Sequence, residues 1–135
     1  MIRIREIDHV VLRVVDANSM IAFYTEVLGC SIERRQDEIG LIQLRAGSAL
    51  VDLVPVDQKL GRMGGAPPGQ EGRNVDHICF RVEPFVADDI FAHLQQHAVQ
   101  HGPLESRYGA EGEGPSIYIN DPEGNTVELK GPPAR

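Results

Sequence analysis

One stretch of this chain occurs twice in similar form. Residues 7–14 (IDHVVLRV) return as residues 75–82 (VDHICFRV), and all eight aligned positions hold identical or similar residue types. A second similarity relates VDLVP at 51–55 to VELKGP at 127–132. A carboxylate follows a valine in both copies. An internal duplication constrains architecture more than local propensity does. The chain is therefore expected to consist of two copies of one module.

Each copy has the same order of expected elements. After the repeated strand comes a helical stretch, at residues 16–29 in the first copy and 84–102 in the second. Asp16 or Asn18 is expected to cap the first helix and Gly29 to end it, while Gly102-Pro103 is expected to stop the second. Three strand-like runs follow each helix; they are residues 30–36, 40–46 and 48–55, then 103–108, 115–120 and 125–130, with a turn at DPEGN, 121–125.

This order predicts an α+β fold of two tandem βαβββ modules that form a cupped mixed sheet with the helices outside. Residues 1–135 are predicted to form a single domain, with a first module at 1–56 and a second at 74–135. Between them, residues 57–73 are rich in glycine and proline. A connection of this length predicts a mobile loop with a function of its own.

Strand alternation predicts which side chains face the cup. If Val10 and Leu12 pack on the helix, His9 points to the opposite, concave face, and the same rule places His77 there. By the same parity Asp52 and Glu128 face the concavity. Two histidines and two carboxylates converge if the modules share one cup.

Carboxylates gathered in a cup require a partner, because burying them unpaired is costly. One divalent metal ion (Zn, Ni, Co, Mn or Fe) would satisfy two neutral imidazoles and two carboxylates and leave positions open for a substrate. The plainer interpretation is that the four residues form ordinary ion pairs. The duplicated register favours the metal.

Charge and composition limit the partners. With a net charge of −7 and no cluster of Lys or Arg, the chain is not expected to bind nucleic acid or an anionic membrane. No apolar run approaches the roughly 20 residues of a membrane span. Cys30 and Cys79 form no C-x-x-C pair, which is typical of a reducing compartment. We expect a cytoplasmic protein, a homodimer from its exposed sheet edges, that binds a small molecule.

The duplicated βαβββ plan, with a histidine on each first strand and an acid on each last strand, resembles the vicinal oxygen chelate superfamily. This group includes glyoxalase I, extradiol dioxygenases, fosfomycin-modifying enzymes and bleomycin resistance proteins. The resemblance covers nearly the whole chain, and DPEGNTVEL at 121–129 is its most familiar signature. It implies that the metal ligands are His9, Asp52, His77 and Glu128.

For the reaction, the resemblance implies a glyoxalase-like lyase or isomerase. Such an enzyme chelates two vicinal oxygens of a small substrate and transfers a proton at the adjacent carbon. Glu128 is the implied base, alternating with Asp52. The sequence departs from glyoxalase I at Asp52, where the family has Glu or Gln. If Asp52 is not a ligand, a set of His9, His77 and Glu128 remains, which suits an iron-dependent extradiol-type dioxygenase.

Binding without catalysis is also compatible with the sequence. The cup could hold a small molecule without turnover, as bleomycin resistance proteins do, although metal-free members typically lack the ligands. Arg107 and Tyr118 are the candidates for substrate binding. A histidine stripe at 93, 97 and 101 is expected to be a solvated helix face. The modules could pair within one chain or across a dimer.

Overall fold

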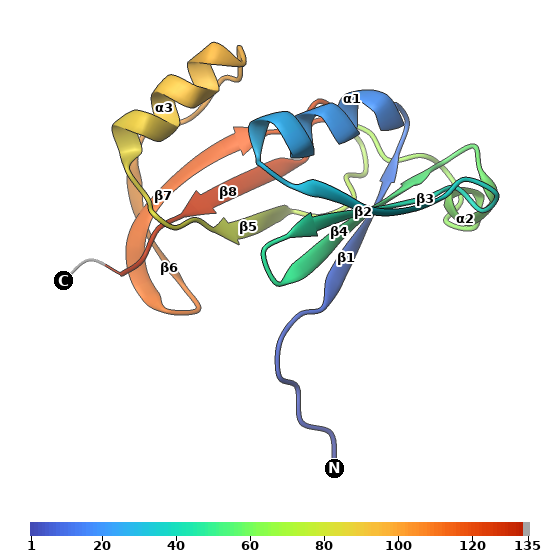
Figure 1. Cartoon of the computed structure of the whole chain (residues 1–135), viewed down its shortest axis with the longest axis horizontal. Coiled ribbons are helices and arrows are strands. Elements are labelled where there is room, and N and C mark those ends of the chain that lie inside the picture. Colours follow the sequence, from blue (N-terminus) through green and yellow to red (C-terminus); the bar gives the residue numbers. More distant parts are fainter. Residues whose placement is uncertain (134–135) are drawn as a thin grey trace. The chain divides into compact units, whose positions relative to one another are not determined.

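The computed structural model describes residues 1–133, in two compact units (Figure 1). The first unit is Met1–Asn74, and the second begins at Val75. Each unit contains a four-stranded mixed sheet and a helical segment after its first strand. The α+β class and the two βαβββ modules predicted from the repeat are therefore confirmed. Within residues 1–133, no helix has the length and apolar character needed to cross a membrane.

The first unit has the strand order β1-β4-β3-β2. β1 runs parallel to β4, and the other neighbours are antiparallel. Asp16 caps the helical segment by accepting a hydrogen bond from Ser19 N, and Gly29 follows its end with a φ of 75°. The elements are β1 His9–Val14, α1 Ala17–Ala22, the π-helical turn η1 Phe23–Val27, β2 Ser31–Gln36, β3 Leu41–Ala46, β4 Ala49–Pro55 and α2 Lys59–Arg62.

The second unit repeats this plan with the strand order β5-β8-β7-β6. β5 is parallel to β8, as β1 is to β4. In the turn before β8, Asp121 Oδ1 accepts hydrogen bonds from the backbone N–H groups of Glu123 and Asn125. The elements are β5 His77–Arg81, α3 Ala87–Gln96, β6 Glu105–Gly109, β7 Gly112–Asn120 and β8 Thr126–Lys130.

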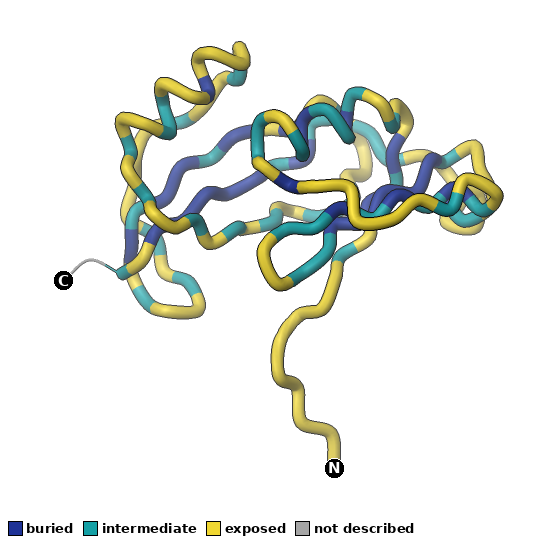
Figure 2. Tube along the Cα trace, viewed as in Figure 1, coloured by how far each residue is buried: buried dark blue, intermediate teal, exposed yellow. Residues whose placement is uncertain are grey.

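Both cores follow the expected strand parity, and the buried stretches of the trace lie along the central strands (Figure 2). In β1, Leu12 and Val14 are fully buried, whereas Val11, on the opposite face, is 46% exposed. Val51 and Leu53 in β4 and Val127 and Leu129 in β8 are likewise buried. This burial of one face leaves the alternate positions, which carry the polar residues, on the other face.

The second helix is shorter than predicted. It ends at Gln96 rather than near Gly102, because Ala98 takes a left-handed conformation with a φ of 55°. Ala98 N then donates to Gln95 O and Val99 N to Leu94 O, the two bonds of a Schellman motif. Glycine is the usual residue at this position of the motif, so the alanine did not indicate that the helix ends there. His101 consequently lies beyond the helix and bridges to Ile119, and the predicted three-histidine helix stripe is wrong.

Arg13 binds the segment between the modules to the first unit through hydrogen bonds. Its guanidinium donates to the carbonyls of Gly61, Gly65 and Ala66 at 2.7 to 3.1 Å. The side chain of Asn74 closes the segment by exchanging two hydrogen bonds of 2.9 Å with the backbone of Arg13. The loop expected at 57–73 therefore has fixed contacts on the first unit as well as a short helix, α2.

Candidate metal-binding site

Both units present a histidine and a carboxylate in the same register. In the first, His9 pairs with Leu50, and Asp52 lies opposite Val11. In the second, His77 pairs with Thr126, and Glu128 lies opposite Cys79. In each case the carboxylate is two residues further along the ladder, so it shares a face with the histidine. The parallel pairing of the first and last strands of each module creates this arrangement twice.

The two histidines are oriented in the same way. His9 Nδ1 lies 2.7 Å from Asp8 Oδ1, and His77 Nδ1 lies 2.7 Å from Asp76 Oδ1. A carboxylate on one ring nitrogen fixes the other nitrogen, Nε2, as the one that offers a lone pair. The hydrogen bond to Asp8, with the negative charges of Asp52 and Asp8, raises the pKa of His9 although desolvation opposes it. Metal-ligating histidines are commonly supported by a carboxylate in this manner.

Asp52 is the less satisfied of the two carboxylates. Its side chain is only 3% exposed, and Oδ2 accepts a hydrogen bond of 3.2 Å from Gln43 Nε2 on the adjacent strand. Its other oxygen, Oδ1, is buried and has no hydrogen-bond partner among residues 1–133. An orphaned buried carboxylate oxygen is costly unless something positive meets it. A divalent cation fits that requirement.

Glu128 is equally buried but well partnered. Oε1 lies 3.3 Å from His77 Nε2, and Oε2 accepts a hydrogen bond of 2.8 Å from Ser116 Oγ. Negative charge from Glu128 also reaches Cys79, whose pKa rises to about 11 through burial of the thiol and this charge. His77 and Glu128 are therefore already in contact through the atoms that a metal ion would use.

Arg107 and Tyr118, the predicted substrate-binding residues, lie beside this second pair. The rings of Tyr118 and His77 meet edge to face with centroids 5.8 Å apart. Arg107 Cζ lies 3.9 Å above the Tyr118 ring, and Arg107 Nη1 donates to Ser116 Oγ at 3.0 Å. Sequence reasoning missed Ser116 and Gln43, although strand parity could have indicated both: Ser116 shares the face of Tyr118, and Gln43 lies opposite Asp52.

Each unit by itself supplies only one histidine and one carboxylate of the predicted ligand set. Over residues 1–133, no group of three or more His, Cys, Asp or Glu side chains is placed to hold a metal ion. The remaining histidines are engaged elsewhere in the second unit. The rings of His93 and His97 lie 4.7 Å apart, and His101 stacks on Phe91. The sheet faces with His9 and His77 are therefore the candidate metal-binding surfaces.

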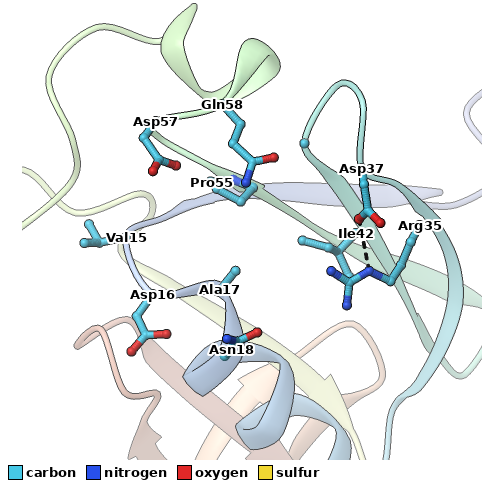
Figure 3. A pocket seen from close by; sticks show the side chains of 11 residues that line it. Val15, Asp16, Ala17, Asn18, Arg35, Asp37, Ile42, Pro55, Asp57 and Gln58 are labelled. Carbon is cyan, nitrogen blue, oxygen red and sulfur yellow. Dashed lines mark hydrogen bonds and ion pairs between the residues drawn. The ribbon is translucent and has the colours of Figure 1, made fainter.

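A separate pocket of about 350 Å³ lies in the first unit (Figure 3). It forms where the end of β4, the start of α1 and the β2–β3 hairpin meet. Asp37 on its wall pairs with Arg35 at 3.3 Å. Asp16 and Asp57 also line it, whereas none of the predicted metal ligands or substrate-binding residues does. The pocket is therefore distinct from the paired-residue faces.

Comparison with known proteins gives a consistent result. The model of the Glyoxalase/Bleomycin resistance protein/Dioxygenase superfamily matches residues 6–129. The virulence protein STM3117 of Salmonella typhimurium is 36% identical over 93% of this chain and 83% of its own length. Its solved structure has a TM-score of 0.80, with 30% identity over 97% of this chain and 99% of that one. The glyoxalase domain-containing protein RDO1 of Mycosarcoma maydis is 34% identical over 93% of this chain and 68% of its own.

Proposed function

Because the chain belongs to the Glyoxalase/Bleomycin resistance protein/Dioxygenase superfamily, we propose that it is a metal-dependent lyase or isomerase of the glyoxalase type. The observation that carries this proposal is the orphaned oxygen of Asp52, buried on the face it shares with His9. We assign His9, Asp52, His77 and Glu128 as ligands of one divalent metal ion. The pairs combine within one chain or between the two copies of a cytoplasmic homodimer.

The bound ion would supply Lewis-acid polarisation of two adjacent substrate oxygens, which makes the neighbouring C–H bond more acidic. The chain supplies the remaining functions. Asp8 and Asp76 hold the imidazoles in place. Glu128, or Asp52 in alternation, accepts the proton from carbon and returns it at the adjacent atom. Burial of both carboxylates limits access of bulk water to this transfer.

Arg107 and Tyr118 are assigned to the substrate. Stacking on Tyr118 and the bond from Nη1 to Ser116 hold the guanidinium in place, so its remaining N–H groups are oriented before a ligand arrives. A guanidinium held in this way suits an anionic group such as a carboxylate. We therefore propose a small substrate that carries two vicinal oxygens and a negative charge.

The proximity of Tyr118 to His77 favours a second candidate. Extradiol-type dioxygenases use iron and require a tyrosine near the metal. They also require an additional acid–base histidine, and in the second unit the three other histidines lie on or beyond α3. A lyase or isomerase is therefore the preferred function, and the identity of the bound metal distinguishes it from a dioxygenase.

The test is elemental analysis of untagged protein purified without chelator, for the wild type, His9→Ala and His77→Ala. His97→Ala is the matched control, because His97 lies at the end of α3 outside the proposed set. We expect about one metal ion per chain, lost in both ligand variants and retained in the control. Zn, Ni, Co or Mn would direct assays to hemithioacetals and epimerisation, and iron to catechols under O₂. Absence of metal from the wild type would refute the proposal and indicate a binding protein.

A further inference from the structure

Three side chains of the second unit form a hydrogen-bonded chain that ends on Glu128. Arg107 Nη1 donates to Ser116 Oγ at 3.0 Å, and Ser116 Oγ lies 2.8 Å from Glu128 Oε2. Ser116 is fully buried. A hydroxyl has one proton to donate and can accept bonds on its lone pairs, whereas a guanidinium can only donate. The single proton of Ser116 must therefore point to Glu128, and Arg107 fixes that direction.

This bond determines which oxygen of Glu128 is free to bind a cation. Oε2 is held by Ser116, while Oε1 lies 3.3 Å from His77 Nε2. Rotation of the carboxylate would break the 2.8 Å bond inside a buried environment, at the cost of an unsatisfied polar group. Glu128 consequently presents Oε1 beside the histidine before any ion arrives.

The first unit holds its carboxylate differently, because Gln43 Nε2 donates directly to Asp52 Oδ2. Tyr118 lies opposite Glu128 as Gln43 lies opposite Asp52. Two residues before Tyr118 the chain has Ser116, but two residues before Gln43 it has Leu41, whose side chain offers no hydrogen bond. Ser116 is therefore not part of the duplicated pattern. It belongs to the second unit alone, together with Arg107.

We propose that Ser116 is a positioning residue that holds Glu128 with Oε1 directed to the metal, and that Arg107 sets the direction of the Ser116 hydroxyl. This inference rests on the proposed function, since it assumes that Glu128 is a ligand. It assigns no chemical step to Ser116. The role is to orient a ligand before the ion binds, as hydrogen-bonding partners of ligands do in metal sites.

The experiment measures Zn²⁺ affinity by competition with a chromophoric chelator. Ser116→Ala is expected to weaken binding by about 10-fold to 100-fold, the usual cost of removing a partner of a ligand. Ser116→Thr, which keeps the hydroxyl, should restore most of the affinity. Ser106→Ala is the matched control, because Ser106 is exposed on β6 and bonds Glu113 instead. An unchanged affinity in Ser116→Ala would overturn the inference while leaving the metal site intact.

A double-mutant cycle separates positioning from general damage. In a Glu128→Ala background, Ser116→Ala should cause no further loss of Zn²⁺ affinity, because the carboxylate that it positions is absent. An equal loss in both backgrounds would show that Ser116 acts through the fold. A crystal structure of metal-free Ser116→Ala supplies a readout that needs no ion. We expect the Glu128 carboxylate to rotate away from His77, and an unmoved carboxylate would contradict the proposal.

Discussion

The two units share one backbone arrangement but differ in how they satisfy their buried carboxylates. In the first, Asp52 has one hydrogen bond, from Gln43, and an oxygen without a hydrogen-bond partner in residues 1–133. In the second, Glu128 is bonded by Ser116 and lies against His77. The duplication thus fixes where each carboxylate lies on its strand. The neighbouring strand decides whether both of its oxygens are satisfied before a cation binds.

The largest difference between the copies is expected at two equivalent arginines. Arg13 binds three backbone carbonyls of the linker, whereas Arg81 pairs with Glu111 and Glu83 near the surface. Arg13→Ala should lower the free energy of unfolding by about 2–4 kcal/mol, because charged hydrogen bonds to carbonyls are lost. Arg81→Ala should cost less than about 1 kcal/mol. Urea denaturation measures both, and equal losses would show that the linker contacts contribute nothing.

The carboxylates themselves should differ next. In metal-free protein, Glu128→Ala leaves the buried Ser116 hydroxyl without its acceptor and should reduce stability by about 2–3 kcal/mol. Asp52→Ala removes one bond, of 3.2 Å, from Gln43, and should change stability by less than about 1 kcal/mol. Urea denaturation of the two variants side by side measures the difference, and equal losses would contradict it.

Adding metal should make Asp52 important for thermal stability, although its removal has little effect in the metal-free protein. Thermal melting with and without Zn²⁺ should show a ligand-dependent rise in Tm for the wild type that Asp52→Ala loses. A strong destabilisation by Asp52→Ala in the absence of metal would show instead that Asp52 is a structural residue. An unchanged Zn²⁺ effect would remove it from the ligand set and leave His9, His77 and Glu128.

The repeat explains why so much was predictable. Residues 7–14 and 75–82 predicted both first strands, and a valine beside each acid predicted that Asp52 and Glu128 share a face with the histidines. The assignment of all four as ligands stays a prediction. The path of the linker, in contrast, depends on contacts between distant segments. Arg13 meets Gly61 only because the linker returns to the first unit, and no pattern near either residue encodes that path.

The end of α3 was not predicted because the residue type that usually ends a helix is absent. Ala98 ends α3 in a backbone conformation that favours glycine, so the predicted helix ran on to Gly102. Ser116 was overlooked for a different reason. Strand parity places Ser116 on the face of Tyr118, but its role depends on Arg107 and Glu128, which lie on the two flanking strands.

The smallest expected effect concerns the aspartates that precede the histidines. The pKa of His9 is raised above 6.5 first by its hydrogen bond with Asp8. A raised histidine pKa stabilises the fold at pH values below the unfolded pKa, and that contribution is lost as the pH rises through the folded pKa. Metal binding follows the opposite trend, because a proton competes for His9 Nε2 as the pH falls.

Asp8→Asn should therefore lower the pKa of His9, since an amide stabilises the imidazolium less than a carboxylate does. NMR titration of the metal-free protein measures this, with Asp76→Asn as the control that leaves the His9 midpoint unchanged. Below the wild-type midpoint, the variant loses less Zn²⁺ to proton competition, although its less constrained ring weakens binding at high pH. An unshifted His9 midpoint in Asp8→Asn would mean that the Asp8 contact does not persist in solution. The likeness between the two histidines would then rest on strand register alone.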